Sequence, residues 1–439
     1  MLYQFLRFLV TIGIRFYYKE IKIVNRKNVP ENGPCIYIAN HPNTLMDAWM
    51  IGYASKIPIF FMAKGTLFSS PLKNRILRSL NMIPINRRGE GATKGVSNND
   101  SFEACYQILK EGKCLLIFPE GTSHLERHLR ELKSGTARIA LEAEKRNGNK
   151  LGIKVVPLGL NYLDADRFRS RVLIHVGQAI ELTDYHEDFA INQSKTAKKL
   201  TEQFRIRLEQ VLVNSTEKET ELMVDELHDI FQSKYIKQSK RGVQGEIDLL
   251  KQIRDKMDEF SIAEPWKISE IKTLLLELKS KLNQFEIRAD LLDRRFRLKM
   301  FFRQIFVSLI FMIIGLPLFL FGIVHNIFQY KLTDKLVPKL TKDIEYYAPL
   351  SVLLGLILYP ISYLSFMFLL KYTFELNFWQ QISYFALMPI TGLLAYSIHA
   401  YYKHIAIKWR FMTFLMRRKE LVQDLKKQKE QLRTLVFGS

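Results

Sequence analysis

A histidine and an aspartate that lie close together in the chain are the first candidates for chemistry. In IYIANHPNTLMDAW, residues 36–49, an apolar run leads to His41, and Asp47 follows with five residues between the two. A carboxylate that accepts from one ring nitrogen of a histidine leaves the other nitrogen free to take a proton from a hydroxyl. The same stretch is also typical of a strand that enters a helix capped by Asn40 or Asn43. These residues alone leave both interpretations open.

The spacing restricts the geometry of such a pair. Six residues of an ideal helix turn through about 600°, so two helical residues at this separation would face different sides. We therefore expect His41 in the loop after a strand. Asp47 is then expected in an early turn of the next helix, folded back toward the imidazole.

Adjacent arginines form a second candidate site. In LNMIPINRRGEG, residues 80–91, Arg87 and Arg88 follow an apolar run and precede a glycine. Guanidinium groups can bind phosphate through two parallel hydrogen bonds. On their own, two surface arginines are more often simply solvated.

A turn after another apolar run is the third candidate. In LLIFPEGTSHLERHLRELKSGTARIAL, residues 115–141, Glu120, Gly121 and Thr122 make a tight loop whose backbone N–H groups could hold an anion. Residues 133–136 then begin a helix, and a helix N-terminus also favours an anion. The structural alternative for the first loop is an ordinary turn.

The elements that must position these residues are those of an α/β domain between about residues 24 and 185, where β-branched runs alternate with helical stretches. A proline inside one run, Pro157, cannot donate to a sheet ladder and predicts an edge strand or a bend. In such folds functional groups gather in the loops at strand ends. The expected strands are 35–40, 58–63, 114–119, 154–160 and 171–177, and the expected helices lie in 99–113 and 136–148.

Residues 1–23 predict an amphipathic helix with a wide apolar face. We expect it to lie in the bilayer interface, with packing on a soluble core as the alternative. It has no basic region ahead of the apolar part and no small-residue cleavage site, so we do not expect a signal peptide. Its polar residues recur at helical spacing and are Gln4, Arg7, Thr11, Arg15, Lys19 and Lys22.

The remainder of the chain divides by composition. Residues 186–300 are dense in charge with leucine and isoleucine at helical spacing, which predicts a charged helical region. A transmembrane region is expected over 301–404, followed by a basic cytoplasmic tail over 405–439.

Three apolar segments make up the expected transmembrane region, at 305–328, 348–370 and about 384–400. The first two exceed the roughly 20 residues that cross a bilayer, and the third is marginal. Basic residues flank the first segment and follow the third, which conflicts with three full crossings if positive charge stays inside. We therefore expect the first segment, interrupted at 315–317, to be a re-entrant hairpin, with two crossings and both termini cytoplasmic.

Charge and cysteine content bound the partners. The 439 residues carry a formal net charge of +21, which indicates anionic partners such as membrane lipids or phosphorylated substrates. The basic residues do not gather with aromatics in one stripe, so we do not expect nucleic-acid binding. Three scattered cysteines predict no disulfide framework and favour a reducing compartment, and no metal-ligand cluster is visible. The oligomeric state stays unknown at this level.

Taken together and in order, these stretches resemble the glycerophospholipid acyltransferase family. The blocks of that family are an Asn-His with a downstream Asp, a hydrophobic run that ends near an arginine, a Phe-Pro-Glu-Gly-Thr sequence and a strand that contains Val-Pro. All four occur between residues 40 and 162. The resemblance implies an α/β acyltransferase domain over 24–185, with a mixed sheet flanked by helices.

The resemblance also implies catalytic roles. His41 would be the general base that activates an acceptor hydroxyl for attack on an acyl thioester, and Asp47 would orient it. The donor would be acyl-CoA or acyl carrier protein. Because a thioester supplies the driving force, no metal or redox cofactor is expected.

Acceptor binding is implied for the second and third blocks. Arg87 matches the family's arginine, and we assign the acceptor's phosphate to Arg87, Arg88 and Lys64. Glu120, with Gly121 and Thr122, matches the third block. A glutamate would not bind phosphate favourably, so Glu120 is expected to position a basic neighbour or an acceptor hydroxyl.

Two departures from the family pattern shift the expected acceptor. Five residues instead of the commoner four separate His41 and Asp47, and Ser123-His124 replaces the arginine usual after Glu-Gly-Thr. Both are similar to the branch with eukaryotic glycerol-3-phosphate and dihydroxyacetone-phosphate acyltransferases. Glycerol-3-phosphate therefore joins 1-acylglycerol-3-phosphate as a candidate acceptor.

The sequence thus predicts a membrane-bound acyltransferase of phospholipid biosynthesis, with its catalytic domain on the cytoplasmic face. The alternative is a non-catalytic lipid-binding or scaffolding membrane protein on the same fold. Retention of both His41 and Asp47 argues against that alternative.

Overall fold

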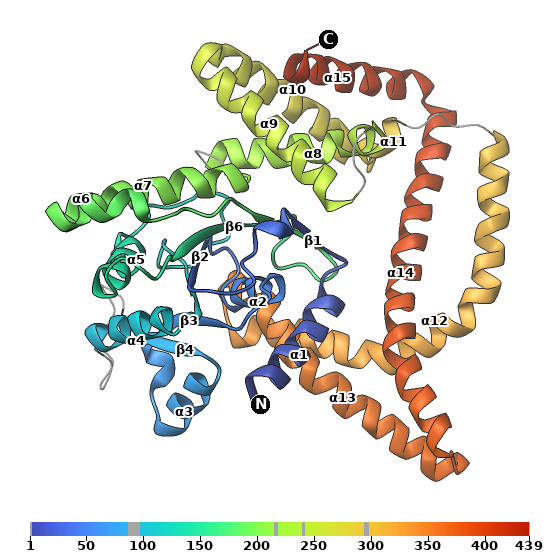
Figure 1. The fold of residues 1–439 in the computed structure, drawn as a ribbon. Helices are drawn as coiled ribbons and strands as arrows, with labels where there is room; N and C mark the ends of the chain where they lie inside the picture. The colour runs from blue at the N-terminus through green and yellow to red at the C-terminus, as the bar shows by residue number, and fades with distance from the viewer. Residues whose placement is uncertain (1, 87–96, 215–217, 239–241, 294–297, 439) are drawn as a thin grey trace. The chain divides into compact units, whose positions relative to one another are not determined.

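The chain folds into two compact units in the computed structural model, which describes residues 2–86, 97–214, 218–238, 242–293 and 298–438 (Figure 1). The first unit comprises Met1–Lys218 and Asp343–Val352, and the second comprises Glu219–Lys342 and Leu353–Ser439. All the described strands belong to the first unit.

Seven strands form one mixed sheet in the order β1-β7-β6-β2-β5-β3-β4. All neighbouring strands are parallel except β6 and β7, which confirms the mixed α/β sheet that the resemblance implies. The carboxyl ends of β2, β5, β3 and β4 therefore lie at one edge of the sheet. The strands are β1 Glu20–Val24, β2 Cys35–Ala39, β3 Ile59–Lys64, β4 Met82–Ile85, β5 Cys114–Ile117, β6 Lys154–Tyr162 and β7 Arg171–Val176.

The core of this unit lies between the sheet and its helices. Ile36 and Leu115 of the central strands share one buried cluster with Ala140 of α5 and with Phe204 and Leu208 of α7. The unit therefore extends past residue 186, although the charged composition resembles that of the region that follows. The helices are α2 Leu45–Ala54, α3 Pro71–Ser79, α4 Asn98–Lys110, α5 Gly135–Arg146, α6 His186–Ile191 and α7 Gln193–Val211.

The N-terminal segment is a helix followed by a strand. The helix, α1 Leu2–Tyr17, ends before β1, which pairs in parallel with β7. Arg7 donates to the carbonyls of Gly52 and Ser55, at 3.0 and 2.8 Å, and so binds one face of α1 to the end of α2. Phe5 and Phe8 are exposed. One face of α1 thus packs on the domain, and another presents apolar side chains to the surroundings.

The position of Pro157 differs from the edge strand predicted for it. It lies in β6, an interior strand that pairs with β2 through Pro157 and Ile38. On the other side, the β7 ladder begins only at Leu158, and Val155 forms an isolated bridge to Ile180. The missing N–H is therefore accommodated at a break in the pairing with the next strand, as expected for a bend.

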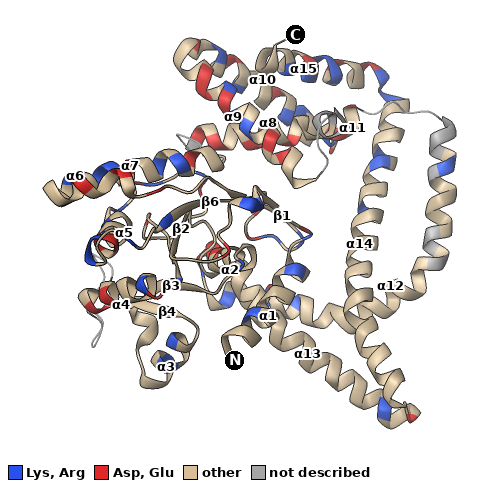
Figure 2. Cartoon of the chain, viewed as in Figure 1, with Lys and Arg blue, Asp and Glu red and all other residues tan. Residues whose placement is uncertain are grey.

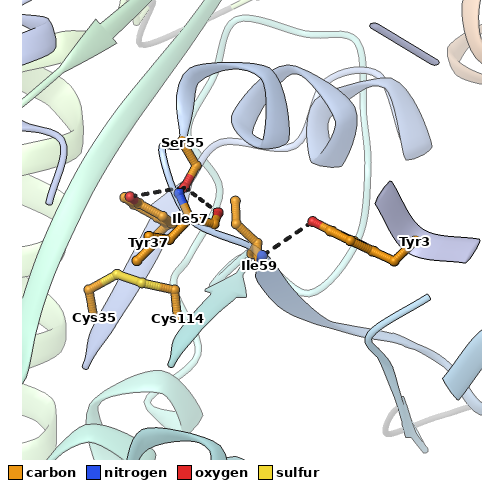
Figure 3. The surroundings of a disulfide bond; sticks show 7 residues. All are labelled: Tyr3, Cys35, Tyr37, Ser55, Ile57, Ile59 and Cys114. Carbon is orange, nitrogen blue, oxygen red and sulfur yellow. Dashed lines mark hydrogen bonds between the residues drawn. A yellow bond between two sulfur atoms is a disulfide. The ribbon is translucent and has the colours of Figure 1, made fainter. Parts of the chain in front are cut away.

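Two cysteines that the sequence leaves unpaired are joined in the structure. Cys35 and Cys114 begin the neighbouring strands β2 and β5, are partners in the parallel register and form a disulfide, with Cα atoms 4.7 Å apart (Figure 3). Both are fully buried, as is the free Cys105. The expectation of no disulfide was wrong for this pair, because strand order brings together residues that are 79 positions apart.

The second unit is helical throughout its described residues. The segment expected as a basic tail forms the end of α14 and then α15, whose Val422, Leu425 and Leu432 are buried. The elements are α8 Lys218–Gln238, α9 Val243–Ala263, α10 Pro265–Gln284, α11 Ala289–Leu292, α12 Leu298–Leu340, α13 Tyr347–Phe374, α14 Phe378–Arg417 and α15 Lys419–Phe437.

The expected re-entrant hairpin is absent from the structure. α12 continues through Pro317 as one helix, so the prediction that the chain reverses near 315–317 was wrong. A proline removes one hydrogen bond of a helix and bends it without ending it when neighbours compensate. Two described helical segments are long and apolar enough to cross a membrane, Ile344–Phe374 and Phe378–Arg417. Charged residues are sparse along α13 (Figure 2).

Candidate active site

The histidine and aspartate of the first block meet at the carboxyl end of β2. His41 lies in the loop after the strand, and Asp47 lies in the first turn of α2. The Nδ1 atom of His41 is 2.9 Å from Oδ2 of Asp47. The imidazole is 11% exposed, and the carboxylate is completely buried. The geometry expected from the spacing is therefore present, with only the histidine open to solvent.

Asp47 is held by two further donors. The backbone N–H of Asn43 donates to Oδ2 at 2.7 Å, and the Tyr162 hydroxyl donates to Oδ1 at 2.9 Å. Burial raises the pKa of the Asp47 carboxyl, and the hydrogen bonds from His41, Asn43 and Tyr162 oppose that rise. Because the Asp47 carboxylate accepts a hydrogen bond from Nδ1 of His41, it favours the tautomer that carries its proton on Nδ1. His41 Nε2 is then the nitrogen with a lone pair, and it has no hydrogen-bond partner among the described residues.

The competing interpretation of this loop, a helix capped by an asparagine, does not hold. The side chain of Asn40 exchanges two hydrogen bonds with the backbone of Leu160 in β6, at 3.0 and 2.8 Å. Asn43 donates instead to the carbonyl of Ala165 at 2.7 Å. Both amides thus fasten the His41 loop to β6 and to the loop that follows it, and α2 begins at Leu45 without a side-chain cap from its N-cap residue, Thr44.

The imidazole of His41 also rests on an aromatic ring. It stacks on Phe118, with ring centroids 3.8 Å apart and planes 6° from parallel. Phe118 directly follows β5, the strand next to β2. The stack fixes the plane of the ring, while the bond to Asp47 fixes its rotation.

Glu120 positions the backbone of His41. Its Oε1 accepts from the N–H of His41 at 3.1 Å, and its Oε2 accepts from the N–H of Arg130 at 3.1 Å. The side chain is 1% exposed, and burial raises its pKa, an effect opposed by the nearby His124. The expectation that Glu120 positions a neighbour rather than binding phosphate is consistent with these contacts.

His124 closes the same loop. Its Nε2 lies 3.2 Å from Glu120 Oε2 and 2.8 Å from the His128 carbonyl, so this nitrogen faces two acceptors and carries a proton. Its backbone N–H donates to the His41 carbonyl at 3.0 Å. Together with the bond from His41 N–H to Glu120, this contact ties the loops after β2 and β5 together.

The groups expected to bind an anion lie along the same edge of the sheet. Lys64 is the last residue of β3, whose strand is separated from β2 by β5. Thr122 is exposed in the loop after β5. Arg87 and Arg88 follow β4 in sequence but lie outside the described residues.

The backbone anion site expected at Gly121 is only partly available. The glycine has a φ of 77° and donates its N–H to the Phe118 carbonyl at 3.0 Å, so this donor is already used. A Cβ built on Gly121 would lie 2.5 Å from Nζ of Lys133. The ammonium group of Lys133 therefore lies directly over the loop and supplies a positive charge there.

The sequence did not predict a role in the site for three side chains: those of Tyr162, Phe118 and Lys133. Each stands next to or inside a quoted block, but its contact depends on which strands are neighbours. In the described part of the chain, no group of three or more His, Cys, Asp or Glu side chains is arranged to hold a metal ion. The absence of a cofactor stays a prediction.

Comparison with known proteins agrees with the class that this sheet and site define. Residues 20–161 match the family model described as Acyltransferase. This segment is therefore an acyltransferase domain. It contains His41, Asp47 and Glu120 and ends just before Tyr162.

Individual relatives that this chain matches are also named as acyltransferases. Glycerol-3-phosphate O-acyltransferase 2 of Saccharomyces cerevisiae is 27% identical over 38% of this chain and 22% of its own length. A probable 1-acyl-sn-glycerol-3-phosphate acyltransferase of Mycoplasma pneumoniae is 31% identical over 30% of this chain and 49% of its own length. The alignment thus spans about a fifth of the yeast relative.

Among solved structures, the 1-acyl-sn-glycerophosphate acyltransferase PlsC of Thermotoga maritima covers 46% of this chain and 76% of its own, at 20% identity and a TM-score of 0.33.

Proposed function

We propose that the chain is a membrane-bound O-acyltransferase. It moves a fatty acyl group from acyl-CoA or acyl carrier protein to a hydroxyl of glycerol-3-phosphate or 1-acylglycerol-3-phosphate, as a step of phospholipid biosynthesis. The observation that carries the proposal is the arrangement of His41, with Nδ1 bound to a buried carboxylate and Nε2 open.

The proposed reaction uses His41 as base and then as acid. Nε2 takes the proton of the acceptor hydroxyl while its oxygen attacks the thioester carbonyl, and Asp47 stabilises the imidazolium that forms. The tetrahedral intermediate then collapses, the carbon–sulfur bond breaks, and the thiol leaves with the proton from Nε2. The ester and the free thiol account for all atoms, and the thioester supplies the driving force.

Acceptor binding is assigned to the cations at the same edge of the sheet. Lys64 and Lys133 are the described candidates, and Arg87 and Arg88 join them from the sequence. Phosphate is a dianion that lysine binds as a point charge and arginine binds through two parallel hydrogen bonds. We propose that the phosphate lies on this side of His41, with the hydroxyl to be acylated facing Nε2.

The domain is proposed to work at the cytoplasmic face. Two crossings, by Ile344–Phe374 and Phe378–Arg417, place both ends of this helix pair on one side of the membrane, and basic residues mark that side as cytoplasmic. A cysteine at Leu376, in the turn between the crossings, should react with an impermeant thiol reagent only from outside. The native cysteines are fully buried and give no background. Reaction of Leu376→Cys only from the cytoplasmic side would reverse the orientation.

The activity is tested on the purified full chain in detergent. Glycerol-3-phosphate, dihydroxyacetone phosphate and lysophosphatidate are each offered with acyl-CoA and with acyl carrier protein charged with the same chain. We expect an ester product from at least one pair and none with His41→Ala. Equal binding of lysophosphatidate by both proteins without turnover would support the lipid-binding alternative instead.

A further inference from the structure

The short 3-10 turn Ile344–Tyr346, directly before α13, contacts both loops of the candidate site. Although distant in sequence, Asp343–Val352 belongs to the same compact unit as the sheet. The carbonyl of Glu345 accepts from the hydroxyl of Thr44 at 3.0 Å. The carboxylate of Glu345 accepts, through Oε1, from the hydroxyl of Ser123 at 2.8 Å. Thr44 lies between His41 and Asp47, and Ser123 lies between Glu120 and His124, so one residue joins the two loops.

The contact with Thr44 is formed against local preference. Thr44 is the N-cap residue of α2, where a threonine hydroxyl ordinarily accepts from the first turn of its own helix. Here the hydroxyl makes no such cap and donates to Glu345 instead. The backbone of Thr44 also has a φ of 43°, a conformation that is costly for a β-branched residue. A strained residue that gives up its local hydrogen bond for a distant one marks a constraint of the site.

The contact with Ser123 uses a position at which this chain departs from the family pattern. An arginine is usual after Glu-Gly-Thr, whereas a serine stands here. A neutral hydroxyl cannot bind phosphate as an arginine does, but it can donate to a carboxylate of the chain itself. The loop after β5 is thereby tied to the 3-10 turn that precedes α13.

The pair of His41 and Asp47 does not depend on these contacts. Asp47 is fixed by the N–H of Asn43 and by Tyr162, and the His41 ring is fixed by Phe118. Loss of the Glu345 side chain would therefore leave the base oriented. It would release Ser123 from its fixed distance to Thr44.

We propose that Glu345 is a positioning residue for the acceptor: it holds Ser123 at a fixed distance from Thr44, at the edge of the sheet where we propose that the acceptor's glycerol-phosphate part lies. The proposal rests on the function proposed above and assigns part of the acceptor site to a segment outside the acyltransferase domain. Its effect falls on acceptor binding and leaves the proton transfer by His41 largely unchanged.

Five variants of the full chain in detergent test this assignment. Glu345→Ala and Ser123→Ala each remove the same hydrogen bond, and the double variant removes nothing more. Glu345→Gln keeps an oxygen that can accept from Ser123 and is the conservative rescue. Glu270→Ala, which removes an exposed glutamate of α10, is the matched control for lost charge. The measurements are kcat and the KM of each substrate, with the acceptor that the wild type acylates.

We expect the KM of the acceptor to rise about 10-fold in Glu345→Ala, in Ser123→Ala and in the double variant alike. The KM of the acyl donor and kcat should change by less than about threefold, and Glu345→Gln and Glu270→Ala should behave as wild type.

An unchanged acceptor KM in Glu345→Ala would overturn the proposal. Additive effects in the double variant, or a Gln variant as impaired as the Ala variant, would do the same. These results concern Glu345 alone, whereas an inactive wild type would remove the proposed function as well.

Discussion

Two histidines, the partly exposed His41 in the first compact unit and the buried His325 in the second, each bind an oxygen through Nδ1 and lie against aromatic rings. His325 of α12 binds the Phe321 carbonyl at 2.7 Å through Nδ1, and its Nε2 faces the Tyr384 hydroxyl. His41 binds the Asp47 carboxylate through Nδ1, and its Nε2 has no partner among the described residues. Each ring lies close to a phenylalanine, Phe321 at 4.1 Å and Phe118 at 3.8 Å between centroids.

The difference between these two environments separates a structural histidine from a candidate base. Both nitrogens of His325 are used, and a carbonyl and a hydroxyl cannot stabilise an imidazolium as a carboxylate can. His41 has an ionisable partner and an open nitrogen. A histidine among aromatic residues is thus uninformative until the partner of each nitrogen is known.

Removal of His41 should have the largest effect on turnover and is the strongest test of the contrast with His325. A positioned base contributes roughly 10²- to 10⁴-fold to turnover, so His41→Ala should lower kcat by at least that range. Steady-state assays in detergent measure this, and an unchanged elution volume in size-exclusion chromatography shows that the variant is folded. Turnover close to wild type would show that His41 is a structural histidine, like His325.

The second largest effect is expected from the carboxylate. Asp47→Asn keeps the size of the side chain but removes the charge that stabilises the imidazolium, and it should lower kcat by about 10²-fold. Because burial raises the pKa of Asp47, wild-type activity should fall with decreasing pH already above the ordinary range of an aspartate, about pH 4. A kcat that does not fall as the pH drops toward this range would contradict the assigned role of Asp47.

Ionisation of Asp47 should have opposite effects on activity and on stability: it supports turnover and destabilises the fold. A carboxyl whose pKa is higher in the folded protein contributes stability that is present below its unfolded pKa and lost as the pH rises through its folded pKa. Thermal unfolding of wild type and Asp47→Asn across this window measures the contribution. We expect the wild type to lose more stability than the variant as the pH rises. The ionised Asp47 would then lower the free energy of unfolding of the wild type.

A smaller effect is expected from the third donor to Asp47. Tyr162→Phe removes one hydrogen bond to the carboxylate and leaves two, and it should lower kcat about 10-fold. Tyr37→Phe is the matched control, because it removes a tyrosine hydroxyl of the neighbouring strand β2 that contacts Ser55 at the end of α2 and not Asp47 (Figure 3). Equal activity of the two variants would show that Tyr162 has no part in orienting the pair.

The smallest effect on activity belongs to His325. His325→Leu leaves the Tyr384 hydroxyl without its partner and should lower the free energy of unfolding by about 1–3 kcal/mol. Turnover should stay at the wild-type level, since His325 belongs to the second compact unit and the acyltransferase site belongs to the first. A loss of turnover with an unchanged melting temperature would give His325 a functional role and end the contrast.

The sequence was sufficient for the parts of the site that depend on local spacing. His41, Asp47 and Glu120 stand in recognisable blocks, and the turn from strand to helix follows from the six-residue separation. The main strands followed from β-branched runs. The short strands β1 and β4 did not, because β1 continues a helical pattern and β4 contains a proline, Pro84, which is disfavoured in strands.

What the sequence could not supply is the order of the strands. Tyr162 reaches Asp47 because β6 lies beside β2, and Glu120 reaches the backbone of His41 because β5 lies on the other side. Glu345 reaches Ser123 from 222 residues away. The hairpin predicted at Pro317 was wrong because a proline inside a long apolar helix is tolerated when neighbouring groups satisfy the freed carbonyl.

The disulfide between Cys35 and Cys114 turns part of the active site into a covalent ring. His41 and Asp47 lie inside the closed segment, while Glu120 and Tyr162 lie outside it. For a separation of 79 residues, the loss of freedom in the unfolded chain corresponds to about 4.5 kcal/mol. A protease cut anywhere between the two cysteines would then leave both pieces joined, and a non-reducing gel should show one band that thiol reductant separates into two.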